Sequence, residues 1–328
     1  MKLQKKNTWI GMTDTFFEII RPGINTTIQD SGRNHLYHMG ITVSGAMDQK
    51  IFKLSNALVN NDLGQGALEF AYQGPLLKLK KGNINFAITG DVHFNIIRKN
   101  SEVEEGKVFE NYLLEENEQI DIVSTKNSVF GYLAVEGGFN IEKVWNSYSI
   151  NTKAKVGPNN GEKFSLEQKI YIRNSEVKKF SKKKIDYQKV LIKNIRVIKG
   201  TNFNYFSEEA KNKFFSEIYS VSNLSDRMGM RLEGPILKNI VNTNIKSEGS
   251  AKGVIQVPAN GQPIILLPDH GTIGGYPKIA VVISADLDNV AQLPPGSKIK
   301  FSEVELDEAE NIFRTYESEI KQYINKIL

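Results

Sequence analysis

The densest group of chemically active side chains in this sequence lies between residues 268 and 278. The segment Pro-Asp-His-Gly-Thr-Ile-Gly-Gly-Tyr-Pro-Lys combines three glycines with a carboxylate, an imidazole, a phenol and an ammonium group. Asp269 and Tyr276 are candidates for acid–base catalysis, and Lys278 for stabilising negative charge. The backbone amides of Gly274 and Gly275 can approach an oxyanion or a carbonyl oxygen. The alternative is a long structural loop on the rim of a barrel.

A second group lies at residues 225–235, Ser-Asp-Arg-Met-Gly-Met-Arg-Leu-Glu-Gly-Pro. The alternation of apolar residues at 228, 230 and 232 predicts a half-buried strand. Its other face would carry one row of residues whose charged side chains point toward a common region: Arg227, Gly229, Arg231 and Glu233. With Asp226 beside them, we expect a functional site. The alternative is an ion-pair network on the surface.

Two shorter segments near the N-terminus also carry charge beside glycine. In Gln29-Asp30-Ser31-Gly32-Arg33, an Asp–Arg pair could pin a loop or bind a substrate carboxylate. Ser44-Gly45-Ala46-Met47-Asp48 is similar, although Asp48 could serve only as a helix N-cap. His35 and His38 are interpreted as a surface or loop pair, and no metal site is predicted.

Periodicity predicts a mainly β chain with a few helices. A helix is expected over residues 47–60, followed by short strands with turn punctuation from 67 to 172, which is typical of a sandwich or barrel. A helix capped by Ser207 and a hairpin at Asn260-Gly261 follow. Residues 306–328 form an amphipathic stripe predicted to pack across the second lobe. The expected divisions are an N-terminal extension (1–15), a first lobe (16–185), a second lobe (190–303) and a terminal helix (304–328).

Composition excludes several classes of function. The chain has 328 residues, a net charge of +5 and no cysteine, so disulfides, thiolate metal sites and a cysteine nucleophile are excluded. No segment resembles a membrane span, no nucleic-acid footprint is recognised, and the predicted location is the cytoplasm. The phosphate-loop, nucleophile-elbow and dinucleotide-binding motifs are absent.

The two groups, with Arg21-Pro22-Gly23, Thr27-x-Gln29-Asp30-x-Gly32-Arg33 and Ser44-Gly45-Ala46-Met47-Asp48, resemble the allophanate-hydrolase subunit 2 family, also called the biotin-dependent carboxyltransferase family. The resemblance runs from about residue 17 to 301. Ser-Asp-Arg-Met-Gly-Met-Arg-Leu-Glu-Gly-Pro and Gly-Gly-Tyr-Pro-Lys-Ile-Ala are its most specific strings. It implies two tandem cyclophilin-like β-barrel lobes and work on amide or urea-like substrates. The positions that match the family's motifs are Asp30, Arg33, Ser44, Asp48, Ser225, Asp226, Arg227, Arg231, Glu233, Glu248, Gln256, Asp269, Thr272, Tyr276 and Lys278.

The resemblance also implies partners and co-substrates. A partner of the allophanate-hydrolase subunit 1 (Kip-inhibitor) type is expected, and a third subunit of the LamB/YcsF type is a further option. Three functions stay open: the C subunit of an ATP-dependent 5-oxoprolinase, the carboxyltransferase half of a biotin-dependent carboxylase, and a non-catalytic antagonist of a Kip-type inhibitor. ATP would be a co-substrate of the complex, and biotin would arrive on a separate carrier. One region departs from the pattern, because Tyr148 and Glu162 stand where the family carries arginines.

Overall fold

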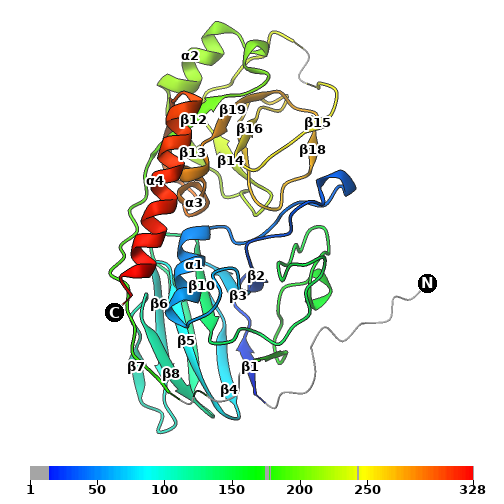
Figure 1. The fold of residues 1–328 in the computed structure, drawn as a ribbon. Coiled ribbons are helices and arrows are strands. Elements are labelled where there is room, and N and C mark those ends of the chain that lie inside the picture. The colour runs from blue at the N-terminus through cyan, green and yellow to red at the C-terminus, as the bar shows by residue number, and fades with distance from the viewer. Residues whose placement is uncertain (1–14, 174–176, 178, 242–243, 328) are drawn as a thin grey trace, which may run out of the picture. The chain divides into compact units, whose positions relative to one another are not determined.

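The computed structural model describes residues 15–173, 177, 179–241 and 244–327, and its contacts divide the chain into two compact units (Figure 1). Unit 1 contains the described residues up to Arg33, Ser44–Lys189 and the chain from Ile320 onward. Unit 2 contains Asn34–Val43 and Val190–Glu319. Residues 34–43 therefore group with unit 2, although the predicted boundaries assigned them to the first lobe. Residues 1–14 of the predicted extension lie outside the described residues.

Unit 1 contains two antiparallel sheets that enclose one core. The order of the six-stranded sheet is β11-β1-β4-β9-β6-β7, and the order of the five-stranded sheet is β2-β3-β10-β5-β8. The strands of the first are β1 Phe16–Arg21, β4 Leu76–Lys80, β6 Val92–Ile97, β7 Val103–Glu105, β9 Gln119–Thr125 and β11 Lys169–Tyr171. Those of the second are β2 Thr27–Gln29, β3 Ala67–Ala71, β5 Asn83–Thr89, β8 Asn111–Glu115 and β10 Phe130–Val135. Buried side chains from both sheets form a single hydrophobic cluster.

The five-stranded sheet is covered on its second face by helix α1, Gln49–Leu58. Strands β3 and β10 are buried at every residue, whereas β4 and β6 alternate between buried and half-buried. The difference arises because α1 buries Ile51, Phe52 and Leu54 in a second cluster against β10 and β5. Asp48 caps α1 by accepting a hydrogen bond from the Ile51 amide at 3.2 Å, so both the predicted helix and the predicted cap are confirmed.

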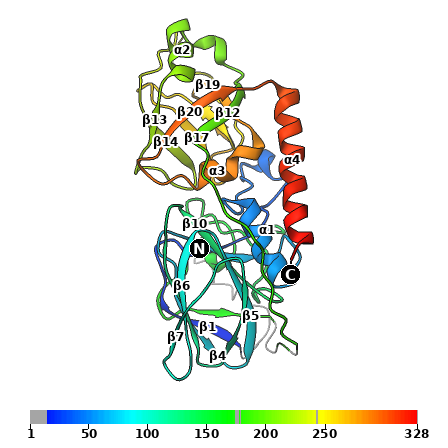
Figure 2. The ribbon, with the colours of Figure 1, turned by 90° about the vertical axis from the view of Figure 1, so that its left-hand side faces the viewer.

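Unit 2 is built on a closed barrel with the strand order β12-β19-β16-β17-β14-β13-β20 (Figure 2). These strands are β12 Asn194–Lys199, β13 Tyr219–Val221, β14 Gly229–Glu233, β16 Val254–Gln256, β17 Ile264–Leu266, β19 Lys278–Val282 and β20 Lys298–Glu303. The parallel pairing of β12 with β20 closes the ring and removes the free sheet edges. The predicted hairpin is confirmed, because β16 pairs with β17 and Gly261 adopts φ +72° between them.

A two-stranded ribbon lies beside this barrel. It consists of β15 Glu248–Gly249 and β18 Ile273–Gly274, with Glu248 opposite Gly274. The ribbon positions two of the predicted site segments against each other.

Unit 2 contains two further helices. Helix α2, Glu208–Ser216, is capped as predicted by Ser207, and its Phe214 stacks on Phe301 with ring centroids 4.5 Å apart. The short helix α3, Leu287–Ala291, had no sequence signal. Single 3₁₀ turns are η1 Tyr37–Met39, η2 Asn159–Gly161, η3 Phe203–Tyr205 and η4 Ser284–Asp286.

Helix α4, Leu306–Asn325, was expected to pack across the second lobe. Its residues up to Glu319 do group with unit 2, whereas the chain from Ile320 onward belongs to unit 1. There Tyr323, Ile324 and Ile327 pack against the cluster under α1. In unit 2, the Tyr316 hydroxyl donates to the Asp288 carboxylate. The overall prediction, a mainly β chain with a few helices in two tandem lobes, is confirmed.

Candidate functional site

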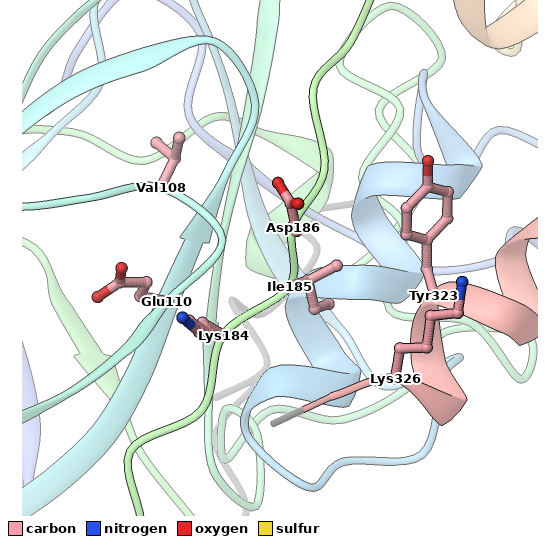
Figure 3. Close-up of a pocket in the computed structure, with 7 residues that line it drawn as sticks. All are labelled: Val108, Glu110, Lys184, Ile185, Asp186, Tyr323 and Lys326. Carbon is pink, nitrogen blue, oxygen red and sulfur yellow. The ribbon is translucent and has the colours of Figure 1, made fainter.

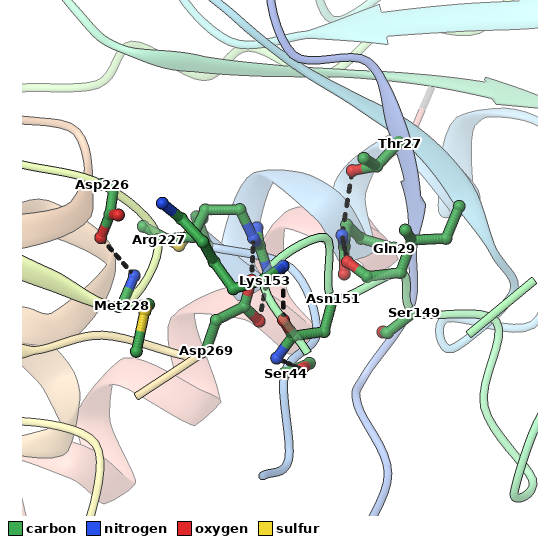
Figure 4. Close-up of polar contacts among 12 residues, drawn as sticks. Thr27, Gln29, Ser44, Ser149, Asn151, Lys153, Asp226, Arg227, Met228 and Asp269 are labelled. Atoms are coloured by element: carbon green, nitrogen blue, oxygen red, sulfur yellow. Dashed lines mark hydrogen bonds and ion pairs between the residues drawn. The ribbon is translucent and has the colours of Figure 1, made fainter. Parts of the chain in front are cut away.

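Arg227 and Asp269 join the two predicted groups of unit 2. The Arg227 Nε donates to Asp269 Oδ2 at 2.8 Å, and Nη2 donates to Oδ1 at 3.2 Å (Figure 4). The Asp269 amide also donates to the Arg227 carbonyl oxygen at 3.0 Å. The two side chains are only 7% and 1% exposed. This two-point ion pair holds the loop before β14 against the loop after β17, and it engages both oxygens of the Asp269 carboxylate.

The segment around Arg227 differs from the predicted single row of charges. Arg231 and Glu233 lie on the exposed face of β14, and Met230 and Leu232 lie on its buried face, as the alternation predicted. Arg227, however, is buried, while Met228 is 38% exposed. The reason is a tight turn between Asp226 and Gly229 that reverses the side-chain direction before the strand begins.

Asp226 and Ser225 shape that turn. The Asp226 Oδ1 accepts from the amides of Met228 at 2.8 Å and Gly229 at 3.3 Å. The Ser225 hydroxyl donates to the Ser222 carbonyl at 2.8 Å and accepts from the Arg231 amide at 3.1 Å. Glu233 accepts from the Ser222 hydroxyl at 2.6 Å. These contacts fix the backbone of the loop that presents Arg227.

Lys278 forms the centre of a second cluster. Its Nζ lies 2.6 Å from Glu248 Oε2, with side-chain exposures of 5% for the lysine and 45% for the glutamate. Gln256 lies opposite Lys278 in the pairing of β16 with β19, and its Nε2 donates to the Ser250 hydroxyl at 3.3 Å. The sequence analysis predicted Lys278, Glu248 and Gln256 as site residues, but it did not predict Ser250. The cluster places an ammonium group and an amide side by side at one end of the barrel.

Gly274 permits this arrangement. A Cβ at that position would lie 2.3 Å from Gln256 Nε2 and 3.1 Å from Ser250 Oγ. Glycine therefore leaves the space that the Gln256 amide occupies. The neighbouring Gly275 carbonyl accepts from the Ile245 amide at 2.9 Å, and the Thr272 carbonyl accepts from the Ser250 amide at 2.9 Å. Tyr276 is 39% exposed.

His270 and Tyr37 form a contact that sequence reasoning missed. The His270 Nδ1 lies 2.6 Å from the Gly271 carbonyl oxygen, and Nε2 lies 3.1 Å from the Tyr37 hydroxyl. Because a carbonyl only accepts, Nδ1 carries the proton and Nε2 accepts from Tyr37. Burial lowers the pKa of His270, which favours this neutral form. The sequence feature that could have pointed to His270 as a site residue is its position directly after Asp269 in a glycine-rich loop.

In unit 1, Asp30 is a buried hub of hydrogen bonds. Its carboxylate accepts from the Gly32 amide at 2.8 Å, the Ser147 hydroxyl at 2.8 Å, the Tyr148 amide at 2.7 Å and the Ser149 hydroxyl at 2.5 Å. Arg33, also buried, donates to the Ser149 carbonyl. Asp30 and Arg33 therefore hold the segment 147–149 against the loop after β2. Of the two roles considered for this Asp–Arg pair, the contacts match the pinning of a loop.

Ser44 and Asp48 are buried on either side of the turn that leads into α1. The Ser44 hydroxyl accepts from Asn151 Nδ2 at 3.3 Å. Asp48 pairs with Lys189, and its amide donates to the Tyr132 hydroxyl at 2.9 Å. Burial raises the pKa of Tyr132, so its phenol stays protonated and donates to Glu69 at 2.7 Å. Within unit 1, these two predicted site residues belong to a buried polar network.

The two positions that depart from the family pattern occupy different environments. Tyr148 is buried, and its hydroxyl accepts from Arg173 at 3.3 Å. Glu162 is exposed and pairs with Lys155 at 3.3 Å. Neither supplies the positive charge of the arginine expected there.

The described residues were also compared with what a metal site and a membrane-spanning helix require. Within them, no three histidine or carboxylate side chains converge in a manner that would hold a metal ion. Nor does any helix there have the length and apolar character to cross a membrane.

The comparisons with known proteins agree with one another. The chain is 33% identical to the C subunit of the 5-oxoprolinase of Escherichia coli (strain K12) over 89% of its own length and 92% of that protein. It is 28% identical to the urea amidolyase of Saccharomyces cerevisiae over 94% of its length, but it spans only 18% of that protein. The crystal structure of the K. lactis urea amidolyase superposes with a TM-score of 0.84 at 24% identity, covering 97% of this chain and 21% of that one. At that identity the superposition establishes the fold alone.

A family model describes the same relationship. The model for the carboxyltransferase domain, subdomains A and B, matches residues 39–303, which include every part of the clusters around Arg227 and Lys278. The match covers most of the chain and both units. This protein belongs to the family of carboxyltransferase domains with subdomains A and B.

Proposed function

We propose that this chain is the C subunit of an ATP-dependent 5-oxoprolinase, a complex that opens the cyclic amide 5-oxoproline to glutamate. The observation that carries the proposal is the 33% identity to the C subunit of an E. coli 5-oxoprolinase, which extends over 92% of that protein. In this proposal ATP is a co-substrate of the complex and is not assigned to a site on this chain.

The chemistry of the reaction fits the cluster around Lys278. A lactam is resonance-stabilised, and attack on its carbonyl carbon moves negative charge onto the oxygen, which must be stabilised. The Lys278 ammonium is buried, while its partner Glu248 is nearly half exposed. A substrate that displaces Glu248 would meet an ammonium already shielded from water, where its charge has the greatest effect. We assign charge stabilisation to Lys278 and substrate orientation to the Gln256 amide.

The pair of Arg227 and Asp269 receives a different role. Each side chain is buried and engaged by the other at two points, so neither presents an unmatched charge. We assign them the task of holding the loop after β17, whose continuation forms β18 and carries Gly274. Asp226 shapes the turn before β14 that presents Arg227, and Tyr276 supplies an exposed phenol for acid–base chemistry.

The proposal requires partner subunits. A subunit of the allophanate-hydrolase subunit 1 (Kip-inhibitor) type is the first expected partner, and a LamB/YcsF-type subunit is a third component. The test is ATP hydrolysis that depends on 5-oxoproline, measured with the co-purified complex and with the complex lacking this chain. Turnover that is indifferent to 5-oxoproline, or that persists without this chain, would remove the proposal.

The second candidate is the carboxyltransferase half of a biotin-dependent carboxylase that acts on urea or a related amide. The observation in its favour is the 28% identity to a urea amidolyase over 94% of this chain, together with the name of the matched family. A separate biotinylated carrier would then be the partner. Transfer of labelled CO₂ from a carboxylated carrier to urea, in place of ATP turnover with 5-oxoproline, would select this candidate.

A further inference from the structure

A cavity in unit 1 is lined by none of the residues assigned to the proposed reaction. Its volume is about 620 Å³, within the range of small-molecule sites. It is lined by Val108, Glu110, Lys184, Ile185, Asp186, Tyr323 and Lys326 (Figure 3). The lining comes from the turn before β8, the extended segment after β11, and the end of α4.

The walls of the cavity are held in place by the fold. The segment 183–185 pairs with residues 109–111, which lead into β8. The Asn111 amide donates to the Lys183 carbonyl oxygen at 3.1 Å, and the Ile185 amide donates to the Phe109 carbonyl oxygen at 2.9 Å. The opposite wall is fixed by aromatic contacts, since Tyr187 lies 5.0 Å from Phe109 and 5.1 Å from Tyr323 between ring centroids. The cavity is therefore formed before any ligand arrives.

The charges in the lining have both signs. Glu110 is engaged by Lys182 at 2.9 Å. Among the described residues, no ion pair is formed by Lys184, Asp186 or Lys326. Figure 3 draws Asp186 between Lys184 and Tyr323 in this view, with the Lys184 ammonium group directed toward Glu110. Besides the paired Glu110, the cavity thus offers the ammonium groups of Lys184 and Lys326 and the carboxylate of Asp186.

This pattern selects against polyphosphates. Two carboxylates in the lining oppose a highly charged anion, and the C-terminal end of α4, which carries partial negative charge, lies at the same cavity. An apolar ligand would pair with none of the charged groups. The matching ligand carries one ammonium group and carboxylates at its ends.

We infer that this cavity binds an acidic α-amino acid, with its ammonium group on Asp186 and its two carboxylates on Lys184 and Lys326. The Tyr323 hydroxyl lies on the same wall as Lys326 and adds a donor for one carboxylate. The inference concerns unit 1 and is independent of the proposed function, because binding requires neither ATP nor a partner subunit.

The test is isothermal titration calorimetry of the purified full chain with L-glutamate as the probe. We expect saturable one-to-one binding that weakens about tenfold in Lys326→Met and in Asp186→Asn, as the loss of one charge-assisted contact implies. Lys321→Met, which replaces an exposed lysine of α4 that does not line the cavity, is the control and keeps the wild-type affinity. Binding that is lost in Lys278→Met and kept in Lys326→Met would place the ligand at the cluster in unit 2 and overturn the inference.

Glutarate, which lacks the ammonium group, is the discriminating ligand. It is expected to bind about tenfold more weakly than L-glutamate, because Asp186 then faces no cation. Absence of saturable binding, equal binding of glutarate, or equal effects of the Lys326 and Lys321 substitutions would each overturn the inference. Circular dichroism of every variant confirms that a loss of binding is not a loss of folding.

Discussion

Lys278 and Glu248 form an ion pair of 2.6 Å in which the lysine is almost wholly buried and the glutamate is nearly half exposed. The asymmetry means that Glu248 can leave while the ammonium stays shielded. If Lys278 stabilises the developing oxyanion, Lys278→Met should lower the 5-oxoproline-dependent ATPase rate of the complex by at least about a hundredfold. Lys298→Met, an exposed lysine of β20, is the control and should leave the rate unchanged. Equal rates in the two variants would exclude Lys278 from the chemistry.

The buried pair of Arg227 and Asp269 predicts a large effect on stability. Arg227→Ala leaves the Asp269 carboxylate, 1% exposed, without the guanidinium that neutralises it. We expect the free energy of unfolding to fall by about 3–5 kcal/mol. Arg231→Ala, on the exposed face of β14, should change it by less than about 0.5 kcal/mol. Denaturant unfolding measures both, and a similar small change in each would show that the pair is not structural.

The features that were predicted correctly from the sequence are those that depend on interactions between residues close together in the chain. The cap at Asp48, the cap at Ser207 and the turn at Gly261 each depend on residues within a few positions of one another. The alternation over 230–233 depends only on the strand period.

The contacts that assemble the candidate site depend on distant residues. Arg227 and Asp269 are separated by 42 positions, and Tyr37 and His270 by 233. Strand register and loop closure determine such pairs, and no local pattern encodes them. The turn at 226–229 shows the consequence, since it buries Arg227 when a continuous strand would have aligned it with Arg231.

His270 makes the stability of unit 2 depend on pH. Burial lowers the pKa of this imidazole below its ordinary value of 6.5, so the unfolded chain binds the proton more readily than the folded one. The contribution of the neutral His270 to the free energy of unfolding is fully present above pH 6.5. It is lost as the pH falls through the pKa of His270 in the folded chain. The slope is at most about 1.4 kcal/mol per pH unit for one proton.

The measurement is the free energy of unfolding of wild type and His270→Gln at pH 7.5 and pH 5.5. We expect the free energy of unfolding to change less between the two pH values in the variant than in the wild type. Tyr37→Phe removes the donor to Nε2 and should cost about 1 kcal/mol at pH 7.5. An identical pH dependence in wild type and His270→Gln would show that this histidine does not carry the effect.

Gly274 offers a way to disturb the Lys278 cluster without unfolding the barrel. In Gly274→Ala the new methyl group would lie 2.3 Å from Gln256 Nε2, so the amide must move away from its contact with Ser250. A flexible side chain can make that shift, and we therefore expect a stability loss of about 1 kcal/mol or less. If the Gln256 amide orients the substrate, KM for 5-oxoproline should rise about tenfold or more. Gly249→Ala is the matched control in the same ribbon, because a Cβ there meets nothing within 4 Å. A KM that rises equally in both variants would indicate that the ribbon as a whole, and not the position of Gln256, determines substrate binding.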